Sequence, residues 1–454
     1  MLDYWPNFAR LCGMQIKKGT EIEVRIDSLV YGGRGIGEYE GKKVFVDGVA
    51  PGDKVRVSLT RIKPRFMEAN LREVLEEGAV RIEPRCKHFD VCGGCKWQFL
   101  PYEEQLRVKE QQVRDSVERI GGFSGDLVGE ILGCEEPWFY RNKMELSFGP
   151  KGMLGFYPPG YHYEVFDLEE CFLQSTQVAE IAAKVREFAR VNGLEVFDKK
   201  SHEGFLRNLV IREGKNTGEI MVNLVTAPGE FSQKEEFVRL MEGVDSVWWT
   251  KVFQEEGRRT RLEEELLAGK ESLVEKLGDL KFDILPQAFF QTNTKQAEML
   301  YSLVVEAACL KGDEVVLDLY CGTGTIGLFC ARQARKVVGV EVNAAAVESA
   351  KMNAKRNGIE NAEFYLGSVD SVLGELPKAD VVIVDPPRSG LGEKVVDGVC
   401  EFGAARIVYV SCNPATLARD AAWLRERGYS LEGVKPVDMF PQTSHVESVA
   451  VLSR

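Results

Sequence analysis

The sequence predicts a multidomain α/β protein with three parts. Residues 15–77 contain short strands separated by glycine-rich turns, which is typical of a small antiparallel, OB-like β-barrel. Residues 287–454 alternate apolar strands with amphipathic helices, the pattern of a doubly wound parallel sheet. Residues 78–286 mix strands and helices around a group of cysteines. We expect an α+β domain there, with part of 102–136 packing on the C-terminal domain.

The composition is that of an ordinary globular protein. The chain has 454 residues, of which 44% are hydrophobic and 28% charged. No stretch approaches the roughly 18 apolar residues that a membrane helix needs. The first 14 residues lack the basic start and apolar core of a secretory signal. We therefore expect a cytoplasmic protein with no membrane partner, and nothing in the sequence demands more than a monomer.

The strands of the predicted barrel carry a basic segment. The net charge of −12 argues against a nonspecific coat of nucleic acid, but it allows a local basic surface. Residues 54–72 hold six Lys or Arg side chains against Glu68 alone. Small barrels with a basic face commonly bind RNA. The alternative is an ordinary solvated strand face.

The central part begins with three closely spaced cysteines, Cys86, Cys92 and Cys95. The chain has 11 cysteines, an odd number, and no signal, so a disulfide framework is not expected. Three nearby thiolates are typical of a metal or cluster site, in which a fourth ligand is still missing. Structural zinc, an iron–sulfur cluster and unliganded cysteines all remain open at this point.

The remaining elements follow from hydrophobic patterning. We expect a helix over 102–119 and a hairpin of two strands over 205–213 and 220–226. Two late segments without a helix between them, 431–440 and 446–454, are expected to form an antiparallel pair at the sheet's edge. The strands of the parallel sheet are expected at 314–320, 336–342, 362–367, 380–385 and 406–412.

A glycine-rich turn follows the first strand of that sheet. Gly322 and Gly324 lie in "VLDLYCGTGTIGLF", where glycines let the backbone approach a ligand closely. Glu341 ends the next strand, 23 positions after Asp318, where a carboxylate can accept hydrogen bonds from ribose hydroxyls. The pattern favours a nucleoside site at the carboxyl ends of the strands. The alternative is a structural turn beside a surface glutamate.

Cys412 ends another strand of the sheet. A free cysteine is usually a small buried hydrophobe. Here it shares a rim with Glu341 and Asp385, and a helix begins at Pro414. The helix dipole is expected to favour a thiolate, and a thiolate at such a rim can act as a nucleophile.

Four motifs carry a family resemblance: "DLYCGTGTIGLF", "VVIVDPPRSG", "SCNPATLARD" and "DMFPQTSHVESV". In this order they closely resemble the S-adenosylmethionine-dependent RNA 5-methyluridine (uracil-C5) methyltransferases. The N-terminal barrel resembles the TRAM domain found in the ribosomal branch of that family. The resemblance implies a Rossmann-like class I methyltransferase domain at the C-terminus.

The resemblance also implies the catalytic roles. Cys412 would add to carbon 6 of uracil, and Asp385 would accept a hydrogen bond from the N3–H of the base. Glu447 is the family-matched general base that removes the proton from carbon 5. His445 is its rival, because the ordinary pKa of an imidazole suits the task.

The cofactor residues come from the same motifs. Phe289 or Phe290 could stack on a base or pack in the core. Tyr320 and Thr325 depart from the Phe and Asn that other members often carry. The residues implied for S-adenosylmethionine are Gln291, Tyr320, Gly322, Gly324, Thr325, Glu341, Ser368 and Asp385.

By the same resemblance, Cys171 is the fourth cysteine ligand of a [4Fe–4S] cluster with Cys86, Cys92 and Cys95. The barrel and cluster together favour methylation of a uridine in 23S rRNA. The alternatives are a tRNA uracil-C5 methyltransferase and a noncatalytic RNA-binding or RNA-folding protein. Cytosine-C5 methylation also uses a cysteine, but the "DPPR" and "SCNP" segments resemble the uracil enzymes.

Overall fold

The computed structural model describes residues 16–78, 81–161, 163–254, 257 and 260–454. The first 14 residues, which the sequence analysis judged not to be a secretory signal, lie outside this part. Within it, no helix has both the length and the apolar character needed to cross a membrane. The ten cysteines of the described residues are free thiols.

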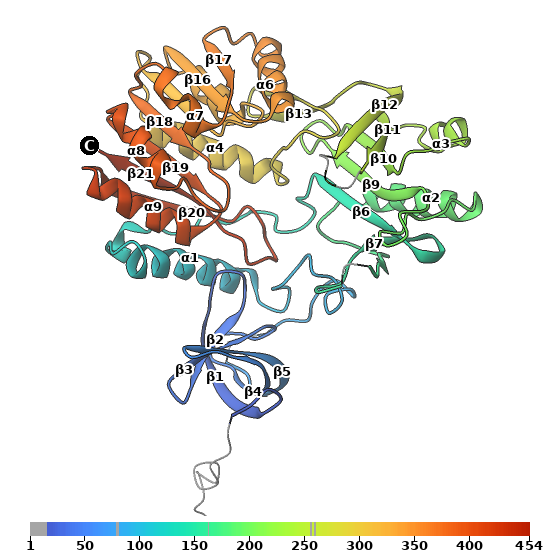
Figure 1. Ribbon diagram of the computed structural model, residues 1–454, viewed down its shortest axis with the longest axis horizontal. Helices are drawn as coiled ribbons and strands as arrows, with labels where there is room; N and C mark the ends of the chain where they lie inside the picture. Colours follow the sequence, from blue (N-terminus) through green and yellow to red (C-terminus); the bar gives the residue numbers. More distant parts are fainter. Residues whose placement is uncertain (1–15, 79–80, 162, 255–256, 258–259) are drawn as a thin grey trace, which may run out of the picture.

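The N-terminal strands close into a five-stranded barrel, drawn in blue in Figure 1, in the order β1-β2-β3-β5-β4. The barrel is not wholly antiparallel as predicted, because β3 and β5 run parallel. A ring with an odd number of strands cannot alternate direction at every neighbour, so one pair must be parallel. The strands are β1 (Glu21–Leu29), β2 (Gly35–Tyr39), β3 (Lys42–Val46), β4 (Lys54–Ile62) and β5 (Phe66–Glu76).

The basic segment on β4 and β5 is partly neutralised. Lys63, Arg65 and Arg72 are exposed and have no carboxylate partner among the described residues. The other three cations pair with carboxylates: Lys54 with Glu23 at 3.4 Å, Arg56 with Glu73 at 2.6 Å and Arg61 with Glu68 at 3.8 Å. The free positive charge on this face is therefore about half of what the sequence shows.

The central part is a mixed seven-stranded sheet in the order β12-β11-β10-β9-β6-β7-β8. Helices α2 (Thr176–Val191) and α3 (Lys234–Leu240) pack on it. The predicted hairpin is present, with β9 and β10 antiparallel. The strands are β6 (Lys143–Gly149), β7 (Met153–Phe156), β8 (Phe166–Asp167), β9 (Leu206–Glu213), β10 (Ile220–Thr226), β11 (Ser246–Phe253) and β12 (Arg261–Gly269).

The C-terminal sheet confirms the predicted doubly wound fold. Its order is β17-β16-β15-β18-β19-β21-β20, with five parallel strands and β21 antiparallel to both its neighbours. The expected antiparallel pair is therefore present, and β20 forms the edge. The strands are β15 (Val315–Leu319), β16 (Lys336–Glu341), β17 (Ala362–Leu366), β18 (Val381–Val384), β19 (Arg406–Ser411), β20 (Ser430–Val437) and β21 (Glu447–Ser453).

Helices cover both faces of this sheet, because alternate residues of its buried strands point to opposite sides. One face packs on α4 (Thr294–Ala308), α5 (Thr325–Ala331) and α6 (Ala344–Arg356). The other packs on α7 (Val369–Val372), α8 (Glu393–Glu401) and α9 (Pro414–Glu426). Short 3₁₀ turns are η2 (Gly125–Leu127), η3 (Pro150–Gly152) and η4 (Leu373–Glu375).

Two earlier segments join this core. Helix α1 (Tyr102–Arg119) buries Val113 and Val117 in the same cluster as α8 and α9, and Figure 1 shows it between the barrel and that layer. The hairpin of β13 (Leu273–Leu277) and β14 (Leu280–Ile284) packs with α4 and α6. The hairpin precedes the expected domain start at residue 287, and we propose that the domain begins with it.

A buried ion pair fixes the loop between β20 and β21. Lys109 of α1 and Asp438 have no exposed side-chain surface, and Lys109 Nζ lies 2.6 Å from Asp438 Oδ1. Lys109 also donates to the carbonyl oxygen of Phe440 at 3.1 Å, and the Tyr102 hydroxyl donates to Asp438 Oδ2 at 2.8 Å. Burial lowers the pKa of Lys109, and Asp438 opposes that shift.

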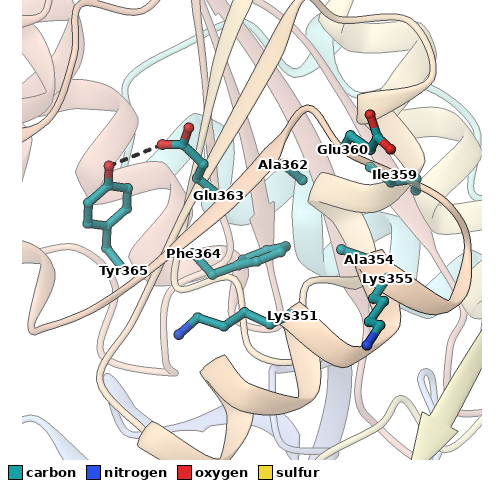
Figure 2. A pocket seen from close by; sticks show the side chains of 9 residues that line it. All are labelled: Lys351, Ala354, Lys355, Ile359, Glu360, Ala362, Glu363, Phe364 and Tyr365. Atoms are coloured by element: carbon teal, nitrogen blue, oxygen red, sulfur yellow. Dashed lines mark hydrogen bonds between the residues drawn. The ribbon is translucent and has the colours of Figure 1, made fainter.

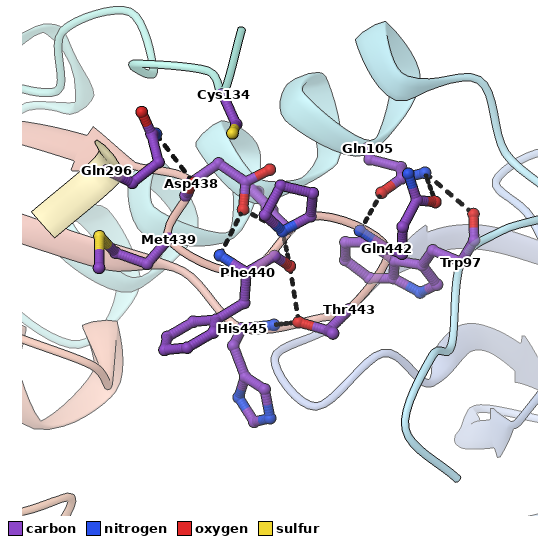
Figure 3. Close-up of polar contacts among 12 residues, drawn as sticks. Trp97, Gln105, Cys134, Gln296, Asp438, Met439, Phe440, Gln442, Thr443 and His445 are labelled. Carbon is purple, nitrogen blue, oxygen red and sulfur yellow. Dashed lines mark hydrogen bonds and ion pairs between the residues drawn. The ribbon is translucent and has the colours of Figure 1, made fainter. Parts of the chain in front are cut away.

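A pair of glutamines fixes the same loop further along (Figure 3). Gln442 has a left-handed backbone, with φ at 69°. Its N–H donates to Gln105 Oε1 at 3.0 Å, and Gln105 Nε2 donates to Gln442 Oε1 at 3.0 Å. The backbone N–H groups of Lys96 and Trp97 donate to the Gln442 carbonyl oxygen at 2.9 and 3.1 Å. The loop is therefore held from α1 and from the segment after the cysteines.

We expect Lys109→Ala to lower the free energy of unfolding by about 3–5 kcal/mol, because Asp438 would stay buried without its cation. Urea unfolding followed by circular dichroism measures it. The matched control is Lys87→Ala, which removes an exposed pair with Glu169 and should change stability far less, because water screens that pair. Equal losses in the two variants would contradict the importance of the buried pair.

Candidate active site

A cavity of about 970 Å³ opens at the carboxyl ends of the C-terminal sheet's strands. This is where ligands bind in open α/β sheets. The cavity brings together side chains that lie up to 306 positions apart in the sequence, from Arg141 to Glu447. The predicted residues that line it are Phe289, Phe290, Gln291, Tyr320, Gly322, Thr325, Glu341, Asp385, Cys412, His445 and Glu447.

Two predicted residues lie outside the lining. Gly324 has a left-handed φ of 78°, and a Cβ there would lie 3.0 Å from Ala350 and from Phe364. It therefore faces the packed interior, where a side chain does not fit. The Ser368 hydroxyl hydrogen-bonds the side chain of Asp370 at the start of α7.

The glycine turn is held by two carboxylates. Glu341 Oε2 accepts from the Gly322 N–H at 3.1 Å. Buried Asp318 accepts from the Gly327 N–H at 2.8 Å, and burial raises the pKa of Asp318 to about 7. Tyr320, just before the turn, has a left-handed φ of 66°, which is costly for a bulky residue. Such strain is typical of functional turns.

Three titratable groups meet around Cys412. Burial raises the pKa of Asp385 to about 7, and it raises the pKa of Glu447 well above its usual range, with Asp385 adding to the shift. The Arg388 guanidinium acts in the opposite direction on Glu447. Both carboxyls therefore resist ionisation in the free protein, and such shifted pKa values are common at functional sites.

The expected thiolate at Cys412 is not favoured in the free protein. Burial, followed by Glu447 and Asp385, raises the pKa of Cys412 to about 11. Helix α9 does begin at Pro414, but the Asn413 side chain accepts from the Ala415 N–H at 3.1 Å. The helix terminus is thus capped by a neighbouring side chain, and desolvation outweighs the dipole.

His445 lies in a positive environment. Burial, followed by the charges of Arg388, Lys109, Lys96 and Arg141, lowers its pKa to about 4. Arg141 and Arg388 also line the cavity. Neither arginine was among the predicted site residues. The "DPPR" motif contains Arg388 and could have signalled it, whereas nothing in the sequence around Arg141 points to this site.

Family comparisons agree with this architecture. The TRAM domain family matches residues 15–71, a methyltransferase domain family matches 310–428, and a DNA methylase family matches 228–352. An uncharacterized RNA methyltransferase of Clostridium tetani is 39% identical, over 96% of this chain and 97% of its own length. One from Halalkalibacterium halodurans is 38% identical, over 96% and 98%.

A solved structure resembles the whole chain. The Pyrococcus abyssi tRNA (uracil-54, C5)-methyltransferase, in complex with S-adenosyl-L-homocysteine, matches with a TM-score of 0.78 and 32% identity. The match covers 95% of this chain and 100% of that one. This chain belongs to the TRAM-domain RNA methyltransferase family. The family inferred from the four sequence motifs is therefore confirmed.

The central sheet of this methyltransferase positions one wall of the cavity. Buried Arg212 of β9 donates to the carbonyl oxygens of Pro286 and Ala288, and Asn142 Nδ2 donates to the Gln291 carbonyl oxygen at 2.8 Å. Phe290 is only 5% exposed and packs in the core, whereas Phe289 is 71% exposed. Of the two phenylalanines, Phe289 is the one free to stack on a base.

The four predicted cysteine ligands of the methyltransferase influence one another. Burial, together with Cys171, Cys92 and Cys86, raises the pKa of Cys95 to about 12. Burial also raises the pKa of Cys171, and Cys92 and Cys86 add to it. In the described part of the chain, no three cysteine, histidine or acidic side chains are placed to hold a single metal ion.

A second hollow of the methyltransferase lies at the β17 edge of the sheet, against α6 (Figure 2). Lys351, Lys355 and Glu360 line it, with Phe364 at its base and the Tyr365 hydroxyl bonded to Glu363. No predicted site residue is among its lining residues. The predicted chemistry therefore belongs to the larger cavity.

We expect Asp385→Asn to be more stable than the wild type at pH 8, by roughly 3–5 kcal/mol, because each pKa unit corresponds to about 1.4 kcal/mol. The folded pKa of about 7 exceeds the usual 3.8, so between these values the folded state keeps a proton that the unfolded state has lost. The free energy of unfolding therefore falls as the pH rises through this range, and asparagine lacks that penalty.

Urea unfolding at pH 4, 6 and 8 measures this difference, which should vanish near pH 4. Asp370→Asn is the matched control, because the Ser368 hydroxyl lowers the pKa of that exposed carboxyl and the sign should reverse. A stability difference for Asp385→Asn that is constant with pH would contradict a raised pKa.

Proposed function

We propose that this methyltransferase transfers the methyl group of S-adenosylmethionine to carbon 5 of a uridine in 23S rRNA, with Cys412 as the nucleophile. The observation that carries the proposal is that Cys412, Asp385 and Glu447 line the same cavity as Glu341 and the Gly322 turn. A thiol and two buried carboxyls beside a nucleoside site suit covalent methylation of a pyrimidine.

The residues present fit S-adenosylmethionine, which when bound supplies an electrophilic methyl group. A Cβ on Gly322 would meet nothing within 4 Å, so the turn leaves open space for a ligand. Glu341 binds the N–H groups of Gly322 and Asn343, at 3.1 and 2.8 Å. These two hydrogen bonds fix the Glu341 carboxylate, and its remaining lone pairs can accept hydrogen bonds from ribose hydroxyls.

Cys412 begins the reaction. Its thiol loses the proton to solvent, and the sulfur bonds to carbon 6 of the uracil. The electrons of the C5–C6 double bond then move toward carbon 5 and the O4 carbonyl, so carbon 5 becomes a nucleophile that accepts the methyl group. Asp385 holds the base by accepting its N3–H.

Glu447, in its ionised form, completes the reaction by taking the proton from carbon 5. The electron pair of that C–H bond reforms the C5–C6 double bond, and the sulfur–carbon bond breaks to release Cys412. The pKa values support Glu447 over His445: the carboxyl's raised pKa makes it the stronger base, whereas a pKa of about 4 makes the imidazole a weak one.

The mouth of the cavity suits a flipped nucleotide. A base must leave its stack to reach Cys412. Phe289 is exposed at the lining and can stack on a neighbouring base, and Arg141 and Arg388 can bind the phosphates that flank it. Lys63 and Arg65 of the barrel add exposed positive charge.

A tRNA substrate is the second candidate, because the Pyrococcus abyssi relative is a tRNA (uracil-54, C5)-methyltransferase. Both candidates use the same chemistry. The TRAM barrel and the four cysteines are the features that favour 23S rRNA. A noncatalytic RNA-folding role would leave the Cys412, Asp385 and Glu447 arrangement without a purpose.

Tritium release from RNA labelled at uracil carbon 5 tests the function. We expect release with 23S rRNA and S-adenosylmethionine, and none from Cys412→Ala. Glu447→Gln should slow release by roughly 10²–10⁴-fold and accumulate a methylated protein–RNA adduct, because the general base is lost. Cys400→Ala is the matched control. It removes a half-buried thiol of α8, outside the cavity, and should stay active.

The outcomes separate the candidates. Release from a tRNA transcript alone would keep the mechanism and overturn the rRNA substrate. No release from either RNA, with S-adenosylmethionine shown to bind, would overturn the enzymatic proposal.

We also propose that Cys86, Cys92, Cys95 and Cys171 hold a [4Fe–4S] cluster. One zinc ion draws its ligands to about 2.3 Å and so needs its sulfurs nearly in contact. A four-iron cube spreads its thiolates to separate corners. Cys86, Cys92 and Cys171 each raise the pKa of Cys95, so the four thiols lie close together, and four cysteine thiolates are the usual ligand set of a [4Fe–4S] cluster. Its role would be structural, since Lys96 and Trp97 directly after Cys95 hold the Gln442 loop.

We expect protein purified without oxygen to be brown, absorbing near roughly 400 nm, and to contain iron rather than zinc. Cys86→Ser should lose the colour and the iron, while Cys309→Ser, which changes an exposed thiol, should keep both. Metal analysis by mass spectrometry measures this. A protein that contains zinc and no iron would refute the cluster.

A further inference from the structure

The loop between β1 and β2 of the barrel rests on the catalytic domain. Gln112 Nε2 of α1 donates to the carbonyl oxygens of Leu29 and Val30, both at 3.1 Å. Lys96 Nζ donates to the Gly32 carbonyl oxygen at 2.8 Å. Both anchors come from segments that also hold the loop between β20 and β21. The barrel is thus fixed at its loop to the same support as the catalytic residues.

The approach is close enough to require glycine. Gly33 has a left-handed φ of 87°, and a Cβ there would lie 2.9 Å from Ser444 Cβ, within van der Waals overlap. Ser444 directly precedes His445 and lies three residues before Glu447. The barrel loop therefore packs on the Ser444 side chain, in the segment that leads to the proposed base.

Tyr31 of this loop reaches the nucleophile's own backbone. Its hydroxyl donates to the Cys412 carbonyl oxygen at 2.9 Å, across 381 positions of sequence. The ring is half-buried, and burial raises the pKa of Tyr31, with Cys412 adding to the shift. On the other side, Asn413 N donates to Ser411 Oγ at 3.1 Å. The peptide that bears the thiol is therefore held from both directions.

We propose that Tyr31 of the TRAM barrel is a positioning residue for the Cys412 nucleophile, so that the barrel forms part of the catalytic machinery as well as an RNA-binding surface. This inference rests on the proposed role of Cys412. Tyr31 lies outside the cavity lining and acts through the Cys412 carbonyl. Without the hydroxyl, the strand end that presents the thiol is less constrained.

Tyr31→Phe tests the inference, because it removes only the hydroxyl. With RNA, we expect kcat to fall by about 2- to 10-fold, the value of one hydrogen bond, with KM and RNA affinity within about 2-fold of wild type. Without RNA, iodoacetamide should alkylate Cys412 faster in the variant by a similar factor, measured by mass spectrometry of its peptide across pH 7–10. Tyr39→Phe changes another tyrosine of the same barrel and should leave both quantities unchanged.

The two assays keep this inference separate from the proposed function. Tyr31→Phe with wild-type kcat and wild-type alkylation would overturn it, as would equal effects in Tyr39→Phe. A loss of RNA affinity with unchanged alkylation would also overturn it, by making Tyr31 a substrate contact. If wild type released no tritium, the proposed function would fail, while a changed alkylation rate in Tyr31→Phe would still support positioning of the thiol.

Discussion

The buried pair of Lys109 and Asp438 is the interaction on which the site depends. It joins α1, which precedes the strands of the central sheet in sequence, to the loop after β20. That loop leads directly to His445 and Glu447, and it has little regular structure to define its course. A charge pair without water has one good geometry, so it can specify position in a way that apolar contacts cannot. The Lys109–Asp438 pair therefore fixes the position of the loop between β20 and β21.

A second constraint runs through the cavity, where function opposes stability. Asp385, Glu447 and Cys412 are each held in a setting that disfavours their charged forms. The burial of apolar side chains on both faces of the sheet offsets the free-energy cost of this desolvation. The three groups therefore resist ionisation in the free protein, and each becomes a strong base or nucleophile once it is ionised.

Sequence patterning predicted the elements well and the connections between distant elements poorly. The apolar strands of the C-terminal sheet and helix α1 were found because their signals are local. The parallel pair of β3 and β5 was missed because it follows from closure of an odd ring. Arg141 and Tyr31 were missed for a related reason: each reaches the site from far along the chain. The Cys412 pKa was misjudged because burial is set by tertiary packing, which the helix start at Pro414 does not reveal.

The place of β21 within its sheet bears on when this protein becomes active during synthesis. The strand lies between β19 and β20 in the sheet, although both precede it along the chain. Neither strand has its final neighbour until β21 has been synthesised. Glu447 is its first residue, and Tyr31, at the opposite end, leaves the ribosome hundreds of residues earlier. The barrel can fold as translation proceeds. Its loop between β1 and β2 cannot pack against the loop between β20 and β21 until that later segment has been synthesised. A nascent chain can thus hold RNA before it can modify it.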